Sequence, residues 1–134
     1  MLSIIIAAGK EAPPVPFEIV TSREFSAAHQ LRLYDGTCEA LHGHNWRVSV
    51  TVASENLDYI GVVMDFHELV RLVDDVVVPM HNRHLNELEP FAKLNPTAEN
   101  VALVIARSLK LPAHARLRRV QVWETSENSA VYTP

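Results

Sequence analysis

Four segments have the apolar content and the bounding turns of β-strands: residues 17–29, 42–53, 116–125 and 130–133. The first alternates apolar with polar residues, although not cleanly. The second alternates well, with Val48, Val50 and Val52 separated by polar side chains. Residues 30–41 join these two strands and contain a strong turn signal at residues 35–36. We therefore expect the first two strands to form a long hairpin.

Two further segments repeat apolar residues at helical spacing, three or four positions apart. In the first, from residue 66 to about residue 78, the repeating positions are Phe66, Leu69, Val70, Val73, Val76 and Val77. Asp65 is a good N-cap for this helix, and Pro79 ends it. Asp74 and Asp75 fall on the opposite face, so we expect water to surround them.

The second helix opens at residues 95–97, with Thr97 as its N-cap. Its buried stripe consists of Val101, Val104, Ile105 and Leu109. Residues 81–86, between the helices, are predicted to be a polar loop. The order strand, strand, helix, helix, strand, strand predicts an α+β domain in which a four-stranded antiparallel sheet carries both helices on one face. Pairing the two exposed sheet edges between subunits would close a barrel, so we expect a ring-shaped homo-oligomer.

The first 16 residues differ from the rest of the chain. Residues 1–8 are apolar, and residues 9–16 are a run of chain breakers with three prolines, which cannot donate to a sheet. We therefore divide the chain into an N-terminal arm and linker, 1–16, and a single domain, 17–134. The apolar start lacks a basic residue and is too short to span a membrane, so we expect neither a targeting signal nor a membrane partner.

Composition narrows the function classes further. With 134 residues, 48% of them hydrophobic and 21% charged, the chain has the composition of one ordinary globular domain. A formal net charge of −4 argues against a nucleic-acid partner held by bulk electrostatics. One cysteine cannot form an internal disulfide, so a reducing, cytoplasmic setting is expected.

Residues 38–44 carry the most specific chemistry, because the lone Cys38 precedes the pair His42 and His44. Alternate side chains of an extended segment point the same way, so the two imidazoles can chelate one metal ion. A catalytic zinc typically takes three protein ligands, and His29, at the end of the first strand, is the best third candidate. Isolated His-x-His pairs are more often ordinary strand or surface residues, and Cys38 could itself be a zinc ligand.

Six pieces of the chain, from about residue 17 to the end, carry a resemblance to a known family. They are residues 25–29, Cys38 with 42–45, 63–66, 85–86, 95–100 and 123–125. In this order and with these spacings the chain resembles the 6-pyruvoyl-tetrahydropterin synthase and 6-carboxy-tetrahydropterin synthase family. The resemblance implies the tunnelling fold, whose subunits pair into barrels, commonly as a hexamer of two trimers. It also implies 7,8-dihydroneopterin triphosphate as substrate.

The family's residues carry over position by position. The resemblance assigns zinc to His29, His42 and His44 and the catalytic thiol to Cys38. It assigns the anchoring of the pterin to Glu124, and it places Thr97 near the same pocket as a substrate-binding residue. These assignments fit the chemistry, since a zinc ion can bind the side-chain hydroxyls of the substrate while a thiolate removes the neighbouring proton.

One motif departs from the family pattern. The family usually has Asp-His four and three residues before the leucine of the Leu-Asn pair, as a proton relay to the cysteine. Here those positions hold His81 and Asn82. We expect His81 to take over the relay directly. The alternatives are a variant with altered activity and a plain surface histidine.

Three classes of function remain open. The first is a zinc-dependent lyase that forms 6-carboxy-tetrahydropterin, a precursor of deazapurine nucleosides such as queuosine, or, as the runner-up, the 6-pyruvoyl product. The second is a non-enzymatic paralogue that binds zinc and pterin but has lost its relay. The third is an unrelated zinc hydrolase with Glu39 or Glu124 as base, although the chain lacks the helical His-Glu-x-x-His signature.

Overall fold

The computed structural model describes residues 15–134, so residues 1–14 of the expected arm and linker lie outside the described residues. The helices and strands are β1 (Phe17–His29), β2 (His42–Ser54), α1 (Phe66–Val77), β3 (Arg83–His84), α2 (Ala98–Ser108), β4 (Arg116–Trp123) and β5 (Ser129–Tyr132). Short 3₁₀ turns at Val78–Met80, Leu85–Glu87 and Glu89–Phe91 connect α1 to α2. The four predicted strands and both predicted helices are confirmed, with ends shifted by at most two residues.

The sheet has one more strand than the sequence predicts. Over residues 15–134 its order is β3-β1-β2-β4-β5, and all neighbours are antiparallel except β3, which runs parallel to β1. The extra strand lies in the segment predicted as a polar loop, where Arg83 and His84 pair with Ala27 and Ala28. That prediction was wrong because two residues are too few to show a strand period. Arg83 and His84 form a strand because they pair with the edge of β1.

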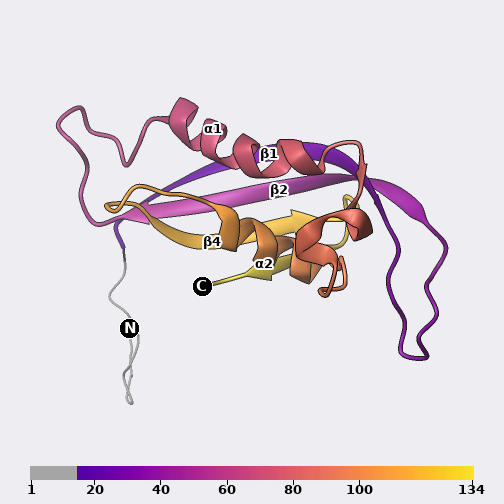
Figure 1. The fold of residues 1–134 in the computed structure, drawn as a ribbon. Helices are drawn as coiled ribbons and strands as arrows, with labels where there is room; N and C mark the ends of the chain where they lie inside the picture. Colours follow the sequence, from indigo (N-terminus) through magenta and orange to yellow (C-terminus); the bar gives the residue numbers. More distant parts are fainter. Residues whose placement is uncertain (1–14) are drawn as a thin grey trace, which may run out of the picture.

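One face of the sheet forms the core. The register pairs Phe25 with Trp46, and β2 places Val48 and Val50 opposite the equally buried Val122 and Val120 of β4. Both helices cover this face, α1 along β1 and α2 over β4 and β5 (Figure 1). None of the helices in the described part of the chain is long and apolar enough to cross a membrane.

Helix α1 follows its predicted pattern with one exception. The Asp65 carboxylate accepts the backbone N–H of His67, which confirms the predicted N-cap. Asp74, however, is not simply surrounded by water. Its two carboxylate oxygens accept hydrogen bonds of 2.8 and 3.1 Å from Arg23, so it ties the helix to β1. The prediction failed because the helical period shows which face a residue occupies but not which strand lies beside that face.

Candidate metal centre and active site

The hairpin of β1 and β2 brings three imidazoles together at one end of the sheet. His29 and His42 are direct register partners, and His44 follows two residues later on the same face of β2. The ring centroids of the three histidines are 4.8, 5.0 and 4.8 Å apart. One ring nitrogen of each lies within 4.8 Å of the other two, an arrangement that could hold a single metal ion. The three residues named from the sequence therefore form one cluster.

Backbone carbonyls orient two of these rings. The Nδ1 of buried His29 lies 2.8 Å from the carbonyl oxygen of Pro96, and that of His42 lies 2.8 Å from the carbonyl of Ala40. A carbonyl only accepts, so in both rings Nδ1 carries the hydrogen and Nε2 presents its lone pair. Metal-ligating histidines are usually oriented by such an outer hydrogen bond.

The remaining ring nitrogens are the strongest sign of a ligand. Among residues 15–134, the Nε2 atoms of His29 and His44 are buried without a hydrogen-bond partner. Buried polar atoms normally have a partner, and a metal ion would supply one for both. Three neutral imidazoles suit Zn²⁺, which typically takes three protein ligands in a catalytic site. The donor set therefore fits the expected zinc ion.

Charges around the cluster bias its protonation. Burial lowers the pKa of His44 below its ordinary value, the neighbouring His29 and His42 act in the same direction, and Glu124 opposes them. A lowered pKa keeps the imidazole neutral near pH 7, the state in which it can bind a metal ion.

Glu124 lies directly beside the cluster. Its Oε2 is 3.5 Å from Nε2 of His29, and its Oε1 is 3.9 Å from Nε2 of His44. The residue follows the end of β4, where its N–H donates to the carbonyl of Asn128 at 3.1 Å. The carboxylate that the family resemblance assigns to the pterin therefore adjoins the predicted metal ligands.

Cys38 is exposed on the hairpin of residues 30–41, which extends beyond the end of the sheet (Figure 1). It forms an isolated antiparallel bridge with Arg32 in the other arm of the hairpin. The thiol is therefore free and lies four residues before His42 in the sequence.

His81 lies at the edge of β1. Its Nδ1 accepts the backbone N–H of Ser26 at 3.1 Å, while the N–H of Asn82 donates to the Ser26 carbonyl at 2.6 Å. No hydrogen bond or ion pair in residues 15–134 joins His81 to Cys38. The relay role of His81 therefore stays a prediction.

Thr97 has a local structural role. Its Oγ1 accepts the N–H of Asn100 at 3.1 Å, which confirms the predicted N-cap of α2, while its role in substrate binding stays a prediction. The residue before it supplies the carbonyl that orients His29, and Asn95 binds the Cys38 hairpin. Sequence reasoning missed both contacts because each involves a backbone group, which has no residue signature, although residues 95–97 belong to a matching motif.

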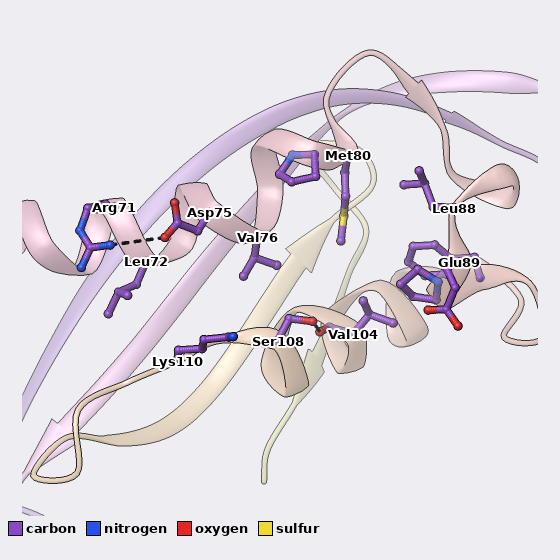
Figure 2. Close-up of a pocket in the computed structure, with 13 residues that line it drawn as sticks. Arg71, Leu72, Asp75, Val76, Met80, Leu88, Glu89, Val104, Ser108 and Lys110 are labelled. Carbon is purple, nitrogen blue, oxygen red and sulfur yellow. Dashed lines mark hydrogen bonds and ion pairs between the residues drawn. The ribbon is translucent and has the colours of Figure 1, made fainter.

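Two hollows differ in their chemistry. A mostly apolar cavity of about 600 Å³ lies between α1 and α2, where Leu72, Val76 and Met80 face Val104 (Figure 2). It contains none of the sequence-predicted site residues. An open hollow of about 590 Å³ is lined by His44 and Asn45 and by residues 82–84. Among the sequence-predicted site residues this hollow contains His44 alone, while Glu124, Cys38 and His81 lie outside its lining.

Comparison with known proteins gives a consistent result. Residues 18–134 match the family model described as 6-pyruvoyl tetrahydropterin synthase. The chain is 37% identical over 111 residues to dihydroneopterin monophosphate aldolase of Pyrococcus furiosus, covering 81% of this chain and 90% of that protein. It is 37% identical over 112 residues to 6-carboxy-5,6,7,8-tetrahydropterin synthase of a Synechocystis species, covering 81% and 86%. The structure of 6-pyruvoyl tetrahydropterin synthase from Caenorhabditis elegans superposes with a TM-score of 0.76 at 26% identity, covering 90% and 96%.

Proposed function

Because this chain belongs to the 6-pyruvoyl tetrahydropterin synthase family, we propose that it is a zinc-dependent lyase that converts 7,8-dihydroneopterin triphosphate to 6-carboxy-5,6,7,8-tetrahydropterin. The observation that carries the proposal is the cluster of His29, His42 and His44. Two of its buried Nε2 atoms have no partner among the described residues, and two of its rings are turned by backbone carbonyls.

These three histidines would hold the zinc ion, which when bound polarises the side-chain hydroxyls of the substrate and acidifies the neighbouring C–H. The protein's part is to keep the ligands neutral and fixed. Burial lowers the pKa of His44, and the carbonyls of Pro96 and Ala40 prevent two of the rings from turning. The ligand geometry is therefore set before the substrate arrives.

Glu124 positions the substrate in this proposal. A carboxylate offers two acceptors that match the N–H edge of a pterin ring. Since its oxygens lie within 4 Å of two ligand imidazoles, a pterin bound there lies next to the metal ligands. The three-carbon side chain of the substrate then lies in reach of the cluster.

Proton transfer falls to Cys38 and His81. Cys38 as thiolate takes the proton from the acidified carbon of the substrate, and His81 exchanges protons with it in place of the usual Asp-His pair. Loss of triphosphate, addition of one water molecule and cleavage of the side chain then release acetaldehyde and leave the carboxylate on the pterin.

A second candidate is the aldolase reaction on dihydroneopterin monophosphate. The similarity to the Pyrococcus protein favours it, and so does Asn82, because an amide cannot transfer a proton where the family usually has a histidine. Aldol cleavage needs one base at the side-chain hydroxyl and returns a proton to the pterin side, so it requires fewer proton transfers than triphosphate elimination with cleavage.

One experiment separates the candidates. The zinc-loaded protein is incubated with each pterin phosphate, and the products are identified by mass spectrometry. Acetaldehyde and free triphosphate support the carboxy synthase, while glycolaldehyde phosphate supports the aldolase. A pyruvoyl product without acetaldehyde indicates the third family reaction. Tight pterin binding without turnover, unchanged in Cys38→Ala, refutes the enzymatic proposal and supports a paralogue that only binds.

We further propose that the protein assembles as a homohexamer of two trimers. Within the described residues, β3 pairs with only two residues of β1, which leaves most of the outer edge of that strand open, and β5 forms the opposite edge. Open edges favour pairing with another copy. Sedimentation analysis tests this, and a monomer at micromolar concentration would contradict it.

A further inference from the structure

The chain beyond His29 stays extended and is bonded along one edge by the returning arm of the hairpin. The N–H of Glu39 donates to the carbonyl of Leu31 at 3.0 Å, and the N–H of Leu31 donates to the Glu39 carboxylate at 3.1 Å. Two residues further, the N–H of Leu33 donates to the carbonyl of Thr37 at 2.6 Å. Leu31 and Leu33 thus direct their backbone groups toward the second arm.

Within residues 15–134 the other edge of this segment has no neighbouring strand, and two asparagine side chains bond it instead. The Asn86 amide accepts the N–H of Gln30 at 3.0 Å and donates to its carbonyl at 2.8 Å. The Asn95 amide does the same for Arg32, at 2.9 and 3.0 Å. A side-chain amide carries the same donor and acceptor as a peptide group, so each asparagine replaces one residue of the missing strand.

Arg32 connects this edge to Cys38, its cross-strand partner in the hairpin. The bonds of Leu31 and Leu33 flank the Arg32–Cys38 pair, which makes it a non-hydrogen-bonded pair. In such a pair the Cα atoms are only about 4.5 Å apart and the backbone groups point away from the partner. The backbone groups of Arg32 therefore point toward Asn95, and fixing Arg32 also fixes Cys38.

The regular ladder alone does not determine where Cys38 lies. Two residues lie between His29 and Arg32, but three lie between Cys38 and His42, although each end forms a cross-strand pair. The second arm therefore contains one extra residue, as in a β-bulge, and bulges change the direction of the strand that follows. An outside support is needed to give the hairpin one position relative to the imidazole cluster.

We propose that Asn86 and Asn95 are positioning residues that act through the backbone of Gln30 and Arg32 to set the place of Cys38 relative to the metal ligands. The proposal rests on the proposed function only in giving Cys38 a part in the reaction. Asn95 precedes Pro96, whose carbonyl orients His29. One short segment thus fixes both the thiol hairpin and a metal ligand.

A nitroxide spin label on Cys38, the only cysteine, measures the position of the hairpin without any substrate. In Asn86→Ala and in Asn95→Ala, we expect the rotational correlation time of the label to fall about twofold or more, since nanosecond loop motion is released. Asn95→Asp keeps the acceptor for the Arg32 N–H but loses the donor, so it should give an intermediate value. The matched control is Asn56→Ala, in an exposed turn after β2. Label spectra unchanged from wild type in both alanine variants would overturn the proposal.

A second readout separates positioning from general destabilisation. The unlabelled Asn86→Ala variant, whose residue lies outside the segment that orients His29, should bind Co²⁺ with wild-type affinity, which also shows that the sheet is folded. With pterin substrate, kcat should fall about tenfold or more while KM changes less than about threefold, because the misplaced group acts in the chemical step. An unchanged kcat in variants with a mobile label would overturn the catalytic part. If the wild type turns over neither pterin phosphate, the proposed function fails, and the label spectra alone decide the structural part.

Discussion

Glu124→Gln tests whether the imidazole cluster is a metal site. The substitution keeps the size of the side chain and removes one negative charge. In the structure the carboxylate oxygens lie 3.5 Å from Nε2 of His29 and 3.9 Å from Nε2 of His44, two buried atoms that have no hydrogen-bond partner among the described residues. A cation bound by these nitrogens would have the carboxylate as a close neighbour.

The magnitude follows from Coulomb's law. A unit charge and a dication about 4 Å apart attract by about 2 kcal/mol at the dielectric constant of water and by about 8 kcal/mol at an effective value of 20. The Glu124 side chain is 30% exposed, so water screens its charge and we use the lower attraction of about 2 kcal/mol. At 1.36 kcal/mol for each factor of ten, Glu124→Gln should weaken zinc binding at least about thirtyfold.

The assay is competition of the protein with a chromophoric chelator for Zn²⁺, repeated with Co²⁺ to follow the ligand geometry. The matched control is Glu127→Gln, an exposed glutamate three residues later, which should change the affinity less than about threefold because a surface charge is screened by water and salt. If Glu124→Gln binds zinc as tightly as the control does, the cluster is not the metal site described here.

Three other outcomes are expected. Thr97→Ala should lower the free energy of unfolding by about 1 kcal/mol in urea denaturation, because it removes the cap of α2, and an unaltered KM for the pterin would show that the hydroxyl does not bind substrate. Trp46→Phe should cost about 1–3 kcal/mol in the same assay, because the buried indole N–H bonds the Ala27 carbonyl at 3.1 Å. In metal-free protein the pKa of His44 is lowered in the folded state, so the unfolded state binds more protons below about pH 6.5. The free energy of unfolding should therefore decrease as the pH is lowered through that range. A stability that is flat from pH 5 to about pH 7 would contradict that pKa direction.

The hairpin that carries the cluster could be predicted from the sequence because it requires only an alternating strand pattern and a turn signal. Alternation puts His42 and His44 on one face of a strand, and a long loop with a turn signal makes the neighbouring segment the partner strand. The register that places His29 opposite His42 then brings the third ring to the same face. In a paired strand, the spacing of residues in the sequence therefore shows which side chains lie close together in space.

The parts that could not be predicted depend on backbone groups and on neighbours distant in sequence. Nothing in the residue types shows that the carbonyl of Pro96 faces His29 or that Asn95 binds the peptide groups of Arg32. The pairing of Arg23 with Asp74 joins residues 51 positions apart, and the side-chain pattern of either segment contains no trace of it. Such contacts follow from the packed fold and not from local pattern.

The imidazoles and Cys38 are supported by different parts of the structure, so metal binding and catalysis should respond to different substitutions. The three imidazoles stand on paired strands, with the buried Trp46 ring at 4.9 Å from His29 and 5.5 Å from His44, so sheet and core hold them together. Cys38 is instead held by a hairpin whose outer edge depends on side-chain amides. Each neutral hydrogen bond contributes about 1 kcal/mol, whereas removing a buried aromatic ring costs about 3–5 kcal/mol. Changes at the amides should therefore affect the reaction before metal binding, and changes at Trp46 should affect both together.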